Sequence, residues 1–164
     1  IMQASKDIKY FIKSKEGLKL SPYKCKAGVP TIGYGATFYP NGVRVTMKDA
    51  AITKERADEL FNFHLSFFEK DLNKLIPEGK LNQHQFDALL SFAFNVGTDI
   101  DQDNIPEGLG DSTLLKKVLL NPKDLTIEKE FWKWDKANGV KVPGLSLRRR
   151  QEAKIYFDGY SEMN

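Results

Sequence analysis

One segment of the sequence is apolar on nearly every side, and it strongly limits how the chain can fold. Between residues 83 and 96 the apolar side chains are Phe86, Ala88, Leu89, Leu90, Phe92, Ala93, Phe94 and Val96. Asn82 followed by Gln85 three positions later has the pattern of a capping box, which predicts that a helix begins there. Because a helix that is apolar all round has no face to turn toward water, it must be buried. We therefore expect a central helix inside a helical lobe.

Apolar residues at three- and four-residue spacing predict the other helices. The longest covers about 54–76, where the apolar face runs from Ala57 to Leu75 and the pattern ends before Pro77. Such a helix is suited to connecting two lobes. Shorter helices are expected over 5–16, 112–121, 126–136 and 145–157, and the acidic stretch 98–111, which contains Gly and Pro, is predicted to be a surface loop.

Short β-prone pieces lie between the first two helices, at 23–25, 31–35 and 43–45. Asn41-Gly42 precedes the last piece and is a strong hairpin signal. Together they predict a small antiparallel sheet, and the fold class is therefore α+β, mainly helical. Gly33 and Gly35 alternate with bulky side chains, so we expect a strand with one bare face that lets a polymer lie close to the backbone.

Length and composition indicate one domain in two lobes. The 164 residues are 41% hydrophobic and include eleven Phe, which is enough for a substantial core. The expected N-terminal lobe covers about 17–55, and the expected C-terminal lobe covers about 77–164 together with the helix 5–16. No run of about twenty apolar residues and no charged-then-apolar leader is visible, so neither membrane insertion nor a signal peptide is expected, although Ile1 before Met2 leaves an upstream export segment open. The single cysteine excludes an intramolecular disulfide.

Three side chains in the stretch 16–35 have the chemistry that cleavage of a glycosidic bond needs. That reaction requires an acid for the departing sugar oxygen and a group across the bond that supplies or steers a nucleophile. Glu16 closes the first predicted helix before Gly17, where the negative end of the helix dipole disfavours its charge and favours a raised pKa. The lone thiol of Cys25 and the hydroxyl of Thr31 follow. Taken alone, Glu16 also fits an ordinary exposed glutamate at a helix end.

The stretch EGLKLSPYKCKAGVPTIGYG resembles the active-site signature of the phage-type lysozymes, glycoside hydrolase family 24. Eight residues separate Glu16 from Cys25 and five separate Cys25 from Thr31, as in that family. The blocks 85–97 and 144–152 match the family as well, so that the resemblance spans nearly the whole chain. It implies a lysozyme-like fold and a muramidase that cleaves the β-1,4 bond between N-acetylmuramic acid and N-acetylglucosamine. It also implies that the protein acts on bacterial cell wall, needs no cofactor and is a monomer.

The resemblance implies a role for each site residue. Glu16 would protonate the leaving oxygen, and Thr31 would hydrogen-bond the attacking water or the far face of the sugar. Cys25 stands where the family commonly has Asp, so a nucleophilic role and a water-positioning role are both open, and so is the stereochemical course. Arg148 would orient Glu16. The residues that line the substrate would be Gly35, Phe94 and Asn95. A second departure is Ala36, where many members have a His regarded as structural.

Other activities fit the sequence less well. Lysines are concentrated near the N-terminus, at Lys6, Lys9, Lys13, Lys15, Lys19, Lys24 and Lys26, and would attract an anionic polymer such as cell wall or nucleic acid. A nucleic-acid partner is not expected, because nucleic-acid binding gives no role to Glu16 and Thr31. The three successive residues Arg148-Arg149-Arg150 point in different directions around a helix, so they do not form one stripe for binding nucleic acid. The alternative interpretation of this run is a set of charges exposed to solvent. His64 and His84 lack ligand spacing with Cys25, so no metal is expected. A lytic transglycosylase and a catalytically silent wall-binding module are the rival functions.

Overall fold

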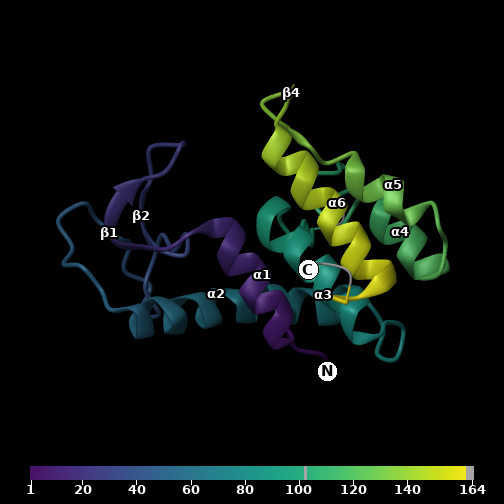
Figure 1. The fold of residues 1–164 in the computed structure, drawn as a ribbon, viewed down its shortest axis with the longest axis horizontal. Coiled ribbons are helices and arrows are strands. Elements are labelled where there is room, and N and C mark those ends of the chain that lie inside the picture. The colour runs from purple at the N-terminus through teal and green to yellow at the C-terminus, as the bar shows by residue number, and fades with distance from the viewer. Residues whose placement is uncertain (102, 162–164) are drawn as a thin grey trace. The chain divides into compact units, whose positions relative to one another are not determined.

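The computed structural model describes residues 1–101 and 103–161, and within them it contains six helices and two small antiparallel sheets (Figure 1). Gln102, inside the predicted acidic loop, lies outside the described residues. The helices are α1 Lys6–Glu16, α2 Lys54–Leu75, α3 Gln83–Val96, α4 Thr113–Leu120, α5 Ile127–Trp132 and α6 Pro143–Asp158. The strands are β1 Lys19–Lys24, β2 Pro30–Gly33, β3 Lys136–Ala137 and β4 Val140–Lys141. The α+β, mainly helical fold class is confirmed.

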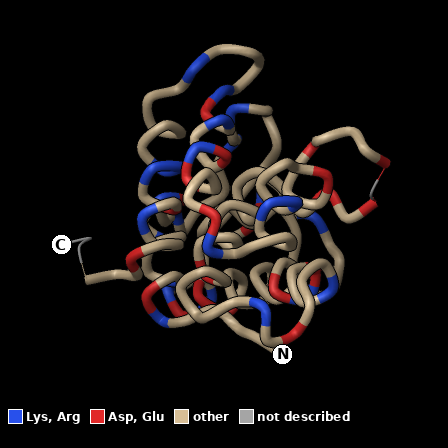
Figure 2. Tube along the Cα trace, turned by 90° about the vertical axis from the view of Figure 1, so that its right-hand side faces the viewer, with Lys and Arg blue, Asp and Glu red and all other residues tan. Residues whose placement is uncertain are grey.

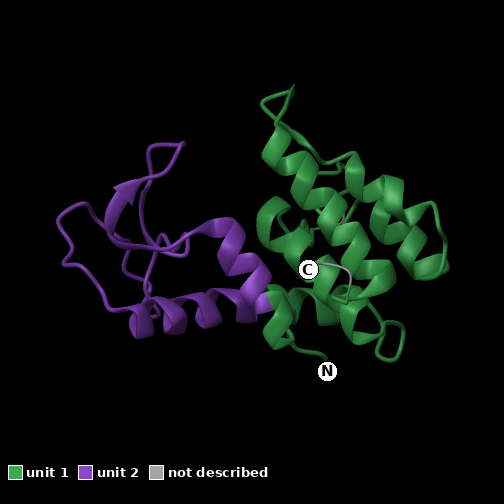
Figure 3. Cartoon of the chain, in the orientation of Figure 1, with its two compact units in different colours: residues 1–8, 68–164 green, residues 9–67 purple. Residues whose placement is uncertain are grey.

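The chain divides into two compact units (Figure 3). Unit 1 contains residues 1–8 and 68–164, and unit 2 contains residues 9–67. The helices α1 and α2 each run from one unit into the other. No helix in the described ranges combines the length and the apolar character that a membrane span requires.

The centre of unit 1 is α3, as the sequence predicts. Every residue from Phe86 to Ala93 is buried. The Asn82 side chain accepts a hydrogen bond from the Gln85 backbone at 2.9 Å, and the Gln85 side chain accepts one from the Asn82 backbone at 3.0 Å, so the capping box is confirmed. Helix α6 packs along α3, and α5 packs on α6 and α4 (Figure 1). The apolar surface of α3 is thus covered by helices that come later in the chain.

Unit 2 is built on a two-stranded sheet. Strand β1 pairs antiparallel with β2, which places Tyr23 directly opposite Thr31. A small apolar cluster of Ile32, Ala36, Val45 and Leu60 connects the loops after β2 to helix α2. The methyl group of Ala36 is buried in this cluster, and the position is therefore apolar in this protein.

The prediction of an extended strand through residue 35 is wrong. Strand β2 ends at Gly33, and both Gly33 and Gly35 have positive φ values, +68° and +91°. Backbone hydrogen bonds of 2.9 Å between Ile32 and Ala36 close a tight turn. A Cβ on Gly33 would lie 3.5 Å from the Cβ of Ala57, so the bare position at Gly33 serves packing against α2. Gly35 is left as the exposed glycine of the turn.

The helix expected over 126–136 ends earlier, at Trp132, and is followed by a hairpin. Asn138 and Gly139 join β3 to β4 with φ values of +52° and +77°. Positive φ at both central residues is the geometry of a type I′ turn, which Asn-Gly favours strongly. The same dipeptide at Asn41-Gly42 forms the predicted turn, with Gly42 at +84° and the Asn41 side chain accepting from the Val43 backbone.

Candidate active site

In unit 2, the end of α1 brings the carboxylate of Glu16 to the turn after β2. The helix ends because Gly17 adopts a φ of +75° and its N–H donates to the Lys13 carbonyl at 2.9 Å. A Cβ built on Gly35 would lie 3.5 Å from Glu16 Oε1. The carboxylate therefore lies against the backbone of Gly35, and two predicted site residues are in contact distance of each other.

The thiol of Cys25 lies in a loop that stabilises its thiolate form. The chain turns back after β1, with the Cys25 N–H donating to the Val29 carbonyl at 3.0 Å and the Gly28 N–H donating to the Cys25 carbonyl at 2.8 Å. Hydrogen bonds to the sulfur from the backbone of Val29 and Ala27 lower the pKa of the thiol, with a further contribution from the Thr31 hydroxyl. Cys25 and Thr31 are thus brought together.

Thr31 has one hydroxyl proton and two acceptors for it. Its Oγ1 donates to the Val29 carbonyl at 2.8 Å, and the same hydroxyl hydrogen-bonds the Cys25 sulfur when that sulfur is ionised. When the proton points to Val29, the lone pairs of the oxygen are free to accept a hydrogen bond from a water. The side chain is almost entirely buried, which keeps the hydroxyl in this position.

Tyr23 belongs to the same group, and sequence reasoning missed it. Burial raises the pKa of its phenol, and the charges of Cys25 and Glu16 raise it further. The ammonium group of Lys19 lies 4.3 Å from the centre of its ring. The signal in the sequence is that Tyr23, near the end of the β-prone stretch, stands only two positions before Cys25.

The other predicted site residues lie in unit 1, at the end of α3 and on α6. The ring of Phe94 packs on Phe68 with centroids 5.0 Å apart. The exposed side chain of Asn95 accepts a hydrogen bond at Oδ1 from Arg149 Nη2, at 2.9 Å. This bond leaves the amide N–H groups of Asn95 for other partners. Asn95 and Arg149 line a hollow of about 400 Å³, together with residues that include Trp134 and Leu145.

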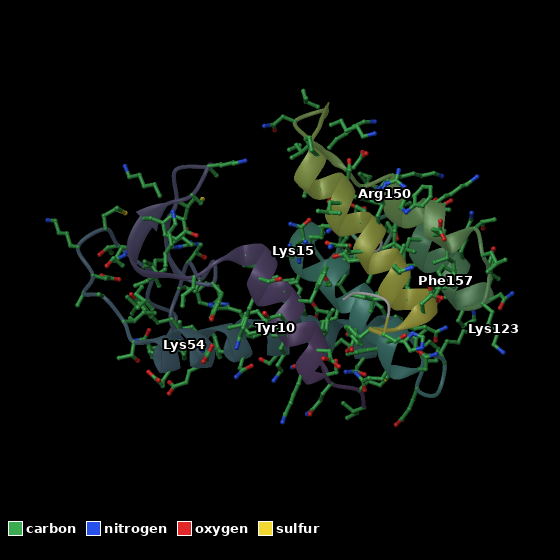
Figure 4. All side chains as sticks on the ribbon, viewed as in Figure 1. Tyr10, Lys15, Lys54, Lys123, Arg150 and Phe157 are labelled. Carbon is green, nitrogen blue, oxygen red and sulfur yellow. The ribbon has the colours of Figure 1, made fainter. Side chains whose placement is uncertain are left out.

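The arginine run divides into buried and exposed positions. Arg148 and Arg149 are buried on either side of Glu152, with the Nε of Arg148 3.2 Å from Oε2 and the Nε of Arg149 2.7 Å from Oε1. The Ser91 hydroxyl donates to Glu152 at 2.6 Å. Burial raises the pKa of Glu152, and the two arginines oppose that rise. The alternative of a solvated charge run is wrong for these two residues, whereas Arg150 is exposed (Figure 4).

Two groups of side chains bear on metal binding. His64 is half-buried on α2 with its Nε2 3.1 Å from the Phe38 carbonyl, and burial lowers its pKa, as expected for a residue of the apolar stripe with a hydrogen-bond partner. In the predicted surface loop, carboxylate oxygens of four aspartates lie within 4.8 Å of one another, namely Asp99, Asp101, Asp103 and Asp111. Oxygen ligands of this kind suit a hard cation such as Ca²⁺. Among the described residues this is the group that could hold a metal ion, and it is separate from Glu16, Cys25 and Thr31 in the sequence.

Comparisons with known proteins show the family of the chain. The family model described as phage lysozyme matches residues 13–152. The endolysin of Acyrthosiphon pisum secondary endosymbiont phage 1 is 38% identical over 152 residues, covering 90% of this chain and 92% of the relative. The endolysin of Salmonella phage P22 is 32% identical over 157 residues, covering 96% and 99%.

Solved structures show the same fold. The endolysin from Escherichia coli O157:H7 phage FAHEc1 superposes with a TM-score of 0.82 at 34% identity, covering 96% of this chain and 94% of that one. A point mutant of P22 lysozyme gives a TM-score of 0.78 at 31% identity, covering 95% and 99%. The prediction of a lysozyme-like fold is confirmed, and the chain belongs to the phage lysozyme family.

Proposed function

We propose that the protein is a muramidase that hydrolyses the β-1,4 bond between N-acetylmuramic acid and N-acetylglucosamine in bacterial peptidoglycan. Family membership supports the reaction and the substrate. The observation that carries the assignment is the grouping of Cys25 with Thr31 on unit 2, together with the contact distance between Glu16 and Gly35. The protein acts on the cell wall as a monomer, without a cofactor or a nucleic-acid partner.

The chemistry we assign is a single displacement by water. Glu16 donates its proton to the glycosidic oxygen as the bond to C1 breaks. A water held by the Thr31 hydroxyl attacks C1 from the opposite face and gives a proton to the Cys25 thiolate. The lowered pKa of Cys25 makes this thiolate available closer to neutral pH than that of a free cysteine. The reaction yields a new reducing end with inverted configuration at C1.

In the same proposal, the other site residues hold the substrate or orient the acid. The amide N–H groups of Asn95 donate to sugar oxygens, because Arg149 occupies its carbonyl. The ring of Phe94 supplies an apolar surface for a sugar, Gly35 lets the glycan approach the backbone, and Arg148 orients the Glu16 carboxylate.

Replacing Glu16 with Gln tests the acid. The amide keeps the shape of the side chain and has no proton to donate, so we expect the rate of wall lysis to fall by a factor of about 10²–10⁴ while the protein stays folded. Turbidity clearing of bacterial cells measures the rate, and circular dichroism measures the fold. Glu55→Gln is the matched control, since Glu55 is an exposed glutamate of unit 2. A folded Glu16→Gln protein that clears cells at more than half the wild-type rate contradicts the assignment.

Mass spectrometry of the digested wall separates the reaction from its rivals. Hydrolysis leaves reducing ends, a lytic transglycosylase leaves anhydro ends, and a silent wall-binding module leaves the glycan uncut. We expect reducing ends from the wild type and intact glycan from Glu16→Gln.

A further inference from the structure

One hollow in unit 1 is lined by polar side chains that can only donate hydrogen bonds to a ligand. Its volume is about 400 Å³, and its wall comes from the end of α3, from α6 and from residues 133, 134 and 136. The polar side chains of this wall are Asn95, Lys133, Trp134, Lys136 and Arg149. Among the described residues that line it, none is acidic. The hollow is named the donor pocket below.

Arg149 sets the orientation of the Asn95 amide. Its Nη2 lies 2.9 Å from Asn95 Oδ1, and a guanidinium has donors only, so the carbonyl oxygen of the amide must be the group that faces it. Arg149 is held in place by burial and by its ion pair with Glu152, whereas Asn95 is exposed. The amide NH2 group is therefore turned away from Arg149, and Asn95 offers two N–H donors to a ligand.

The other polar side chains of the donor pocket have no acceptor either. Lysine ammonium groups, the arginine guanidinium and the indole of tryptophan donate hydrogen bonds and accept none. Lys136 is exposed and makes no ion pair with any residue that the structure describes. Lys133 lies 3.1 Å from Glu130, and its side chain is 66% exposed, so that this pair is open to water. Arg149 Nη1 is buried without a hydrogen-bond partner in the described ranges. The wall therefore contains more donors than the protein itself pairs.

A wall of donors distinguishes a carboxylate from the corresponding amide. Both oxygens of a carboxylate accept hydrogen bonds, and its charge is opposite to that of the lysines. A carboxamide of the same shape has an NH2 group, whose N–H groups would face only donor side chains in the pocket and stay unpaired. Discrimination is strong when the wrong ligand leaves polar groups of the complex unpaired. Figure 2 shows further basic positions on the β3–β4 hairpin and on α6, which add to the positive field.

We propose that the donor pocket binds the first free carboxylate of the peptide attached to N-acetylmuramic acid, so that the enzyme prefers walls in which this carboxylate is not amidated. The proposal rests on the muramidase function proposed above, since the anionic groups of peptidoglycan itself are the carboxylates of its peptide. The first residue of that peptide has its carboxyl group in a peptide bond, so the first free carboxylate belongs to the glutamate at the second position. Asn95 has two N–H groups, of which one donates to a sugar oxygen and the other to this carboxylate.

The experiment compares two soluble disaccharide-peptides that differ only in this carboxyl group, which is free in one and amidated in the other. Each is titrated into the full-length Glu16→Gln protein, which leaves the ligand uncut, and NMR follows the side-chain amide signals of Asn95. We expect the carboxylate form to bind about ten- to hundredfold more tightly, because hydrogen bonds to a charged group are stronger than those to a neutral one. Equal affinity for the two forms overturns the proposal.

A pair of matched variants tests the lysines of the pocket. The test variant is Lys133→Gln/Lys136→Gln, and the control is Lys129→Gln/Lys141→Gln, which removes the same charge from exposed lysines of the same region that do not line the donor pocket. Each variant removes one lysine that has an ion pair, Lys133 or Lys141, and one for which the described residues supply none. We expect the preference for the carboxylate form to fall about fivefold in the test variant and to stay unchanged in the control. An equal fall in both variants contradicts the proposal, because the general positive field would then account for the preference.

Competition separates the peptide from another anion of the wall. Poly(glycerol phosphate) at equal charge concentration should not displace the carboxylate form, and displacement would contradict the assignment of the pocket to the peptide. A failure of this proposal is distinguishable from a failure of the muramidase function. The first appears as equal binding of the two forms, whereas the second appears as uncut glycan after digestion with the wild type.

Discussion

A short loop makes the thiol of Cys25 more acidic than a free cysteine. The backbone N–H groups of Val29 and Ala27 point at the sulfur because the chain reverses direction between β1 and β2, and Thr31 adds its hydroxyl from the facing strand. A carboxylate is charged at neutral pH without such help, which explains why a thiol at this position needs surrounding donors. The loop therefore favours the charged form of the thiol at this position.

The assignment of Cys25 as the group that receives the proton of water predicts the outcome of substitution. Cys25→Asp should retain wall lysis, since the carboxylate accepts a proton equally well, whereas Cys25→Ala should lose most of it. Turbidity clearing measures both variants, with Ser14→Ala as a neighbouring control. Anomer-resolved NMR of the first product should show inverted configuration at C1. Retained configuration would instead assign Cys25 as a covalent nucleophile.

The contribution of Thr31 to the acidity of Cys25 is measurable. Thr31→Val keeps the β-branched shape and removes one of the hydrogen bonds that lower the pKa of the thiol. In the wild type, the rate of iodoacetamide labelling should rise with pH through a midpoint below 9.0, the ordinary thiol value. In Thr31→Val that midpoint should move upward, though not fully to 9.0, because the Val29 and Ala27 donors remain. Thr37→Val serves as the control, and an unchanged midpoint in Thr31→Val would remove the hydroxyl from the site.

Sequence reasoning predicted the side chains of this candidate site but not their surroundings. Glu16, Cys25 and Thr31 follow from residue type and spacing, because these features are local. The thiolate-stabilising donors of Val29 and Ala27 are backbone groups, and any residue supplies them, so no side-chain pattern marks them. In the same way, Arg149 pairs with Asn95 across two helices, and only packing decides which of three successive arginines is buried.

At the scale of elements, the predicted helix bounds lie within two residues of the observed ones except at the end of α5. The capping box at Asn82 consists of two side chains three residues apart, and it forms as predicted. The end of α5 depends on the hairpin that follows, since the type I′ turn at Asn138-Gly139 pairs Lys136 and Ala137 with β4 and removes them from a helix. Asn-Gly thus marks a hairpin at 138–139 as it marks a turn at 41–42.

The capping box supports a quantitative prediction. Asn82→Ala removes the acceptor for the Gln85 N–H and should cost about 0.5–2 kcal/mol of the free energy of unfolding. For a protein of this size that loss corresponds to a Tm lower by roughly 2–4 °C per kcal/mol. Thermal unfolding followed by circular dichroism measures the shift. Asn62→Ala is the control on an exposed position of α2, and a Tm that is equal in both variants would show that the cap contributes nothing.

At the scale of the whole molecule, the two units differ in how many of their residues are buried. Unit 1 surrounds a helix in which eight successive residues are buried. The sheet of unit 2 has two strands, and several of its residues, including Lys19 and Leu20, are exposed. Local opening therefore requires less apolar exposure in the sheet than in α3.

Native-state hydrogen exchange tests this difference. Backbone amides of Leu89 and Leu90 in α3 should exchange only through global unfolding, with a strong dependence on denaturant. Amides of Tyr23 and Ile32 in unit 2 should exchange through a smaller opening of lower free energy. Ile32→Ala should lower protection in unit 2 more than in α3. Equal free energies of exchange for both groups would indicate a single cooperative unit.

The division of the chain into two units also determines the order in which these units can form during synthesis. Unit 2 is continuous in sequence, whereas unit 1 is assembled from the first eight residues and from residues that follow 67. During synthesis on the ribosome, the backbone N–H and the hydroxyl of Ser5 therefore cannot form their hydrogen bonds to the Asp87 carboxylate until Asp87 has been made. At about 5–20 residues per second that wait lasts roughly one to four seconds after residue 67 is made. The nascent chain thus contains all residues of unit 2 before α6, the helix that packs on α3, has been made.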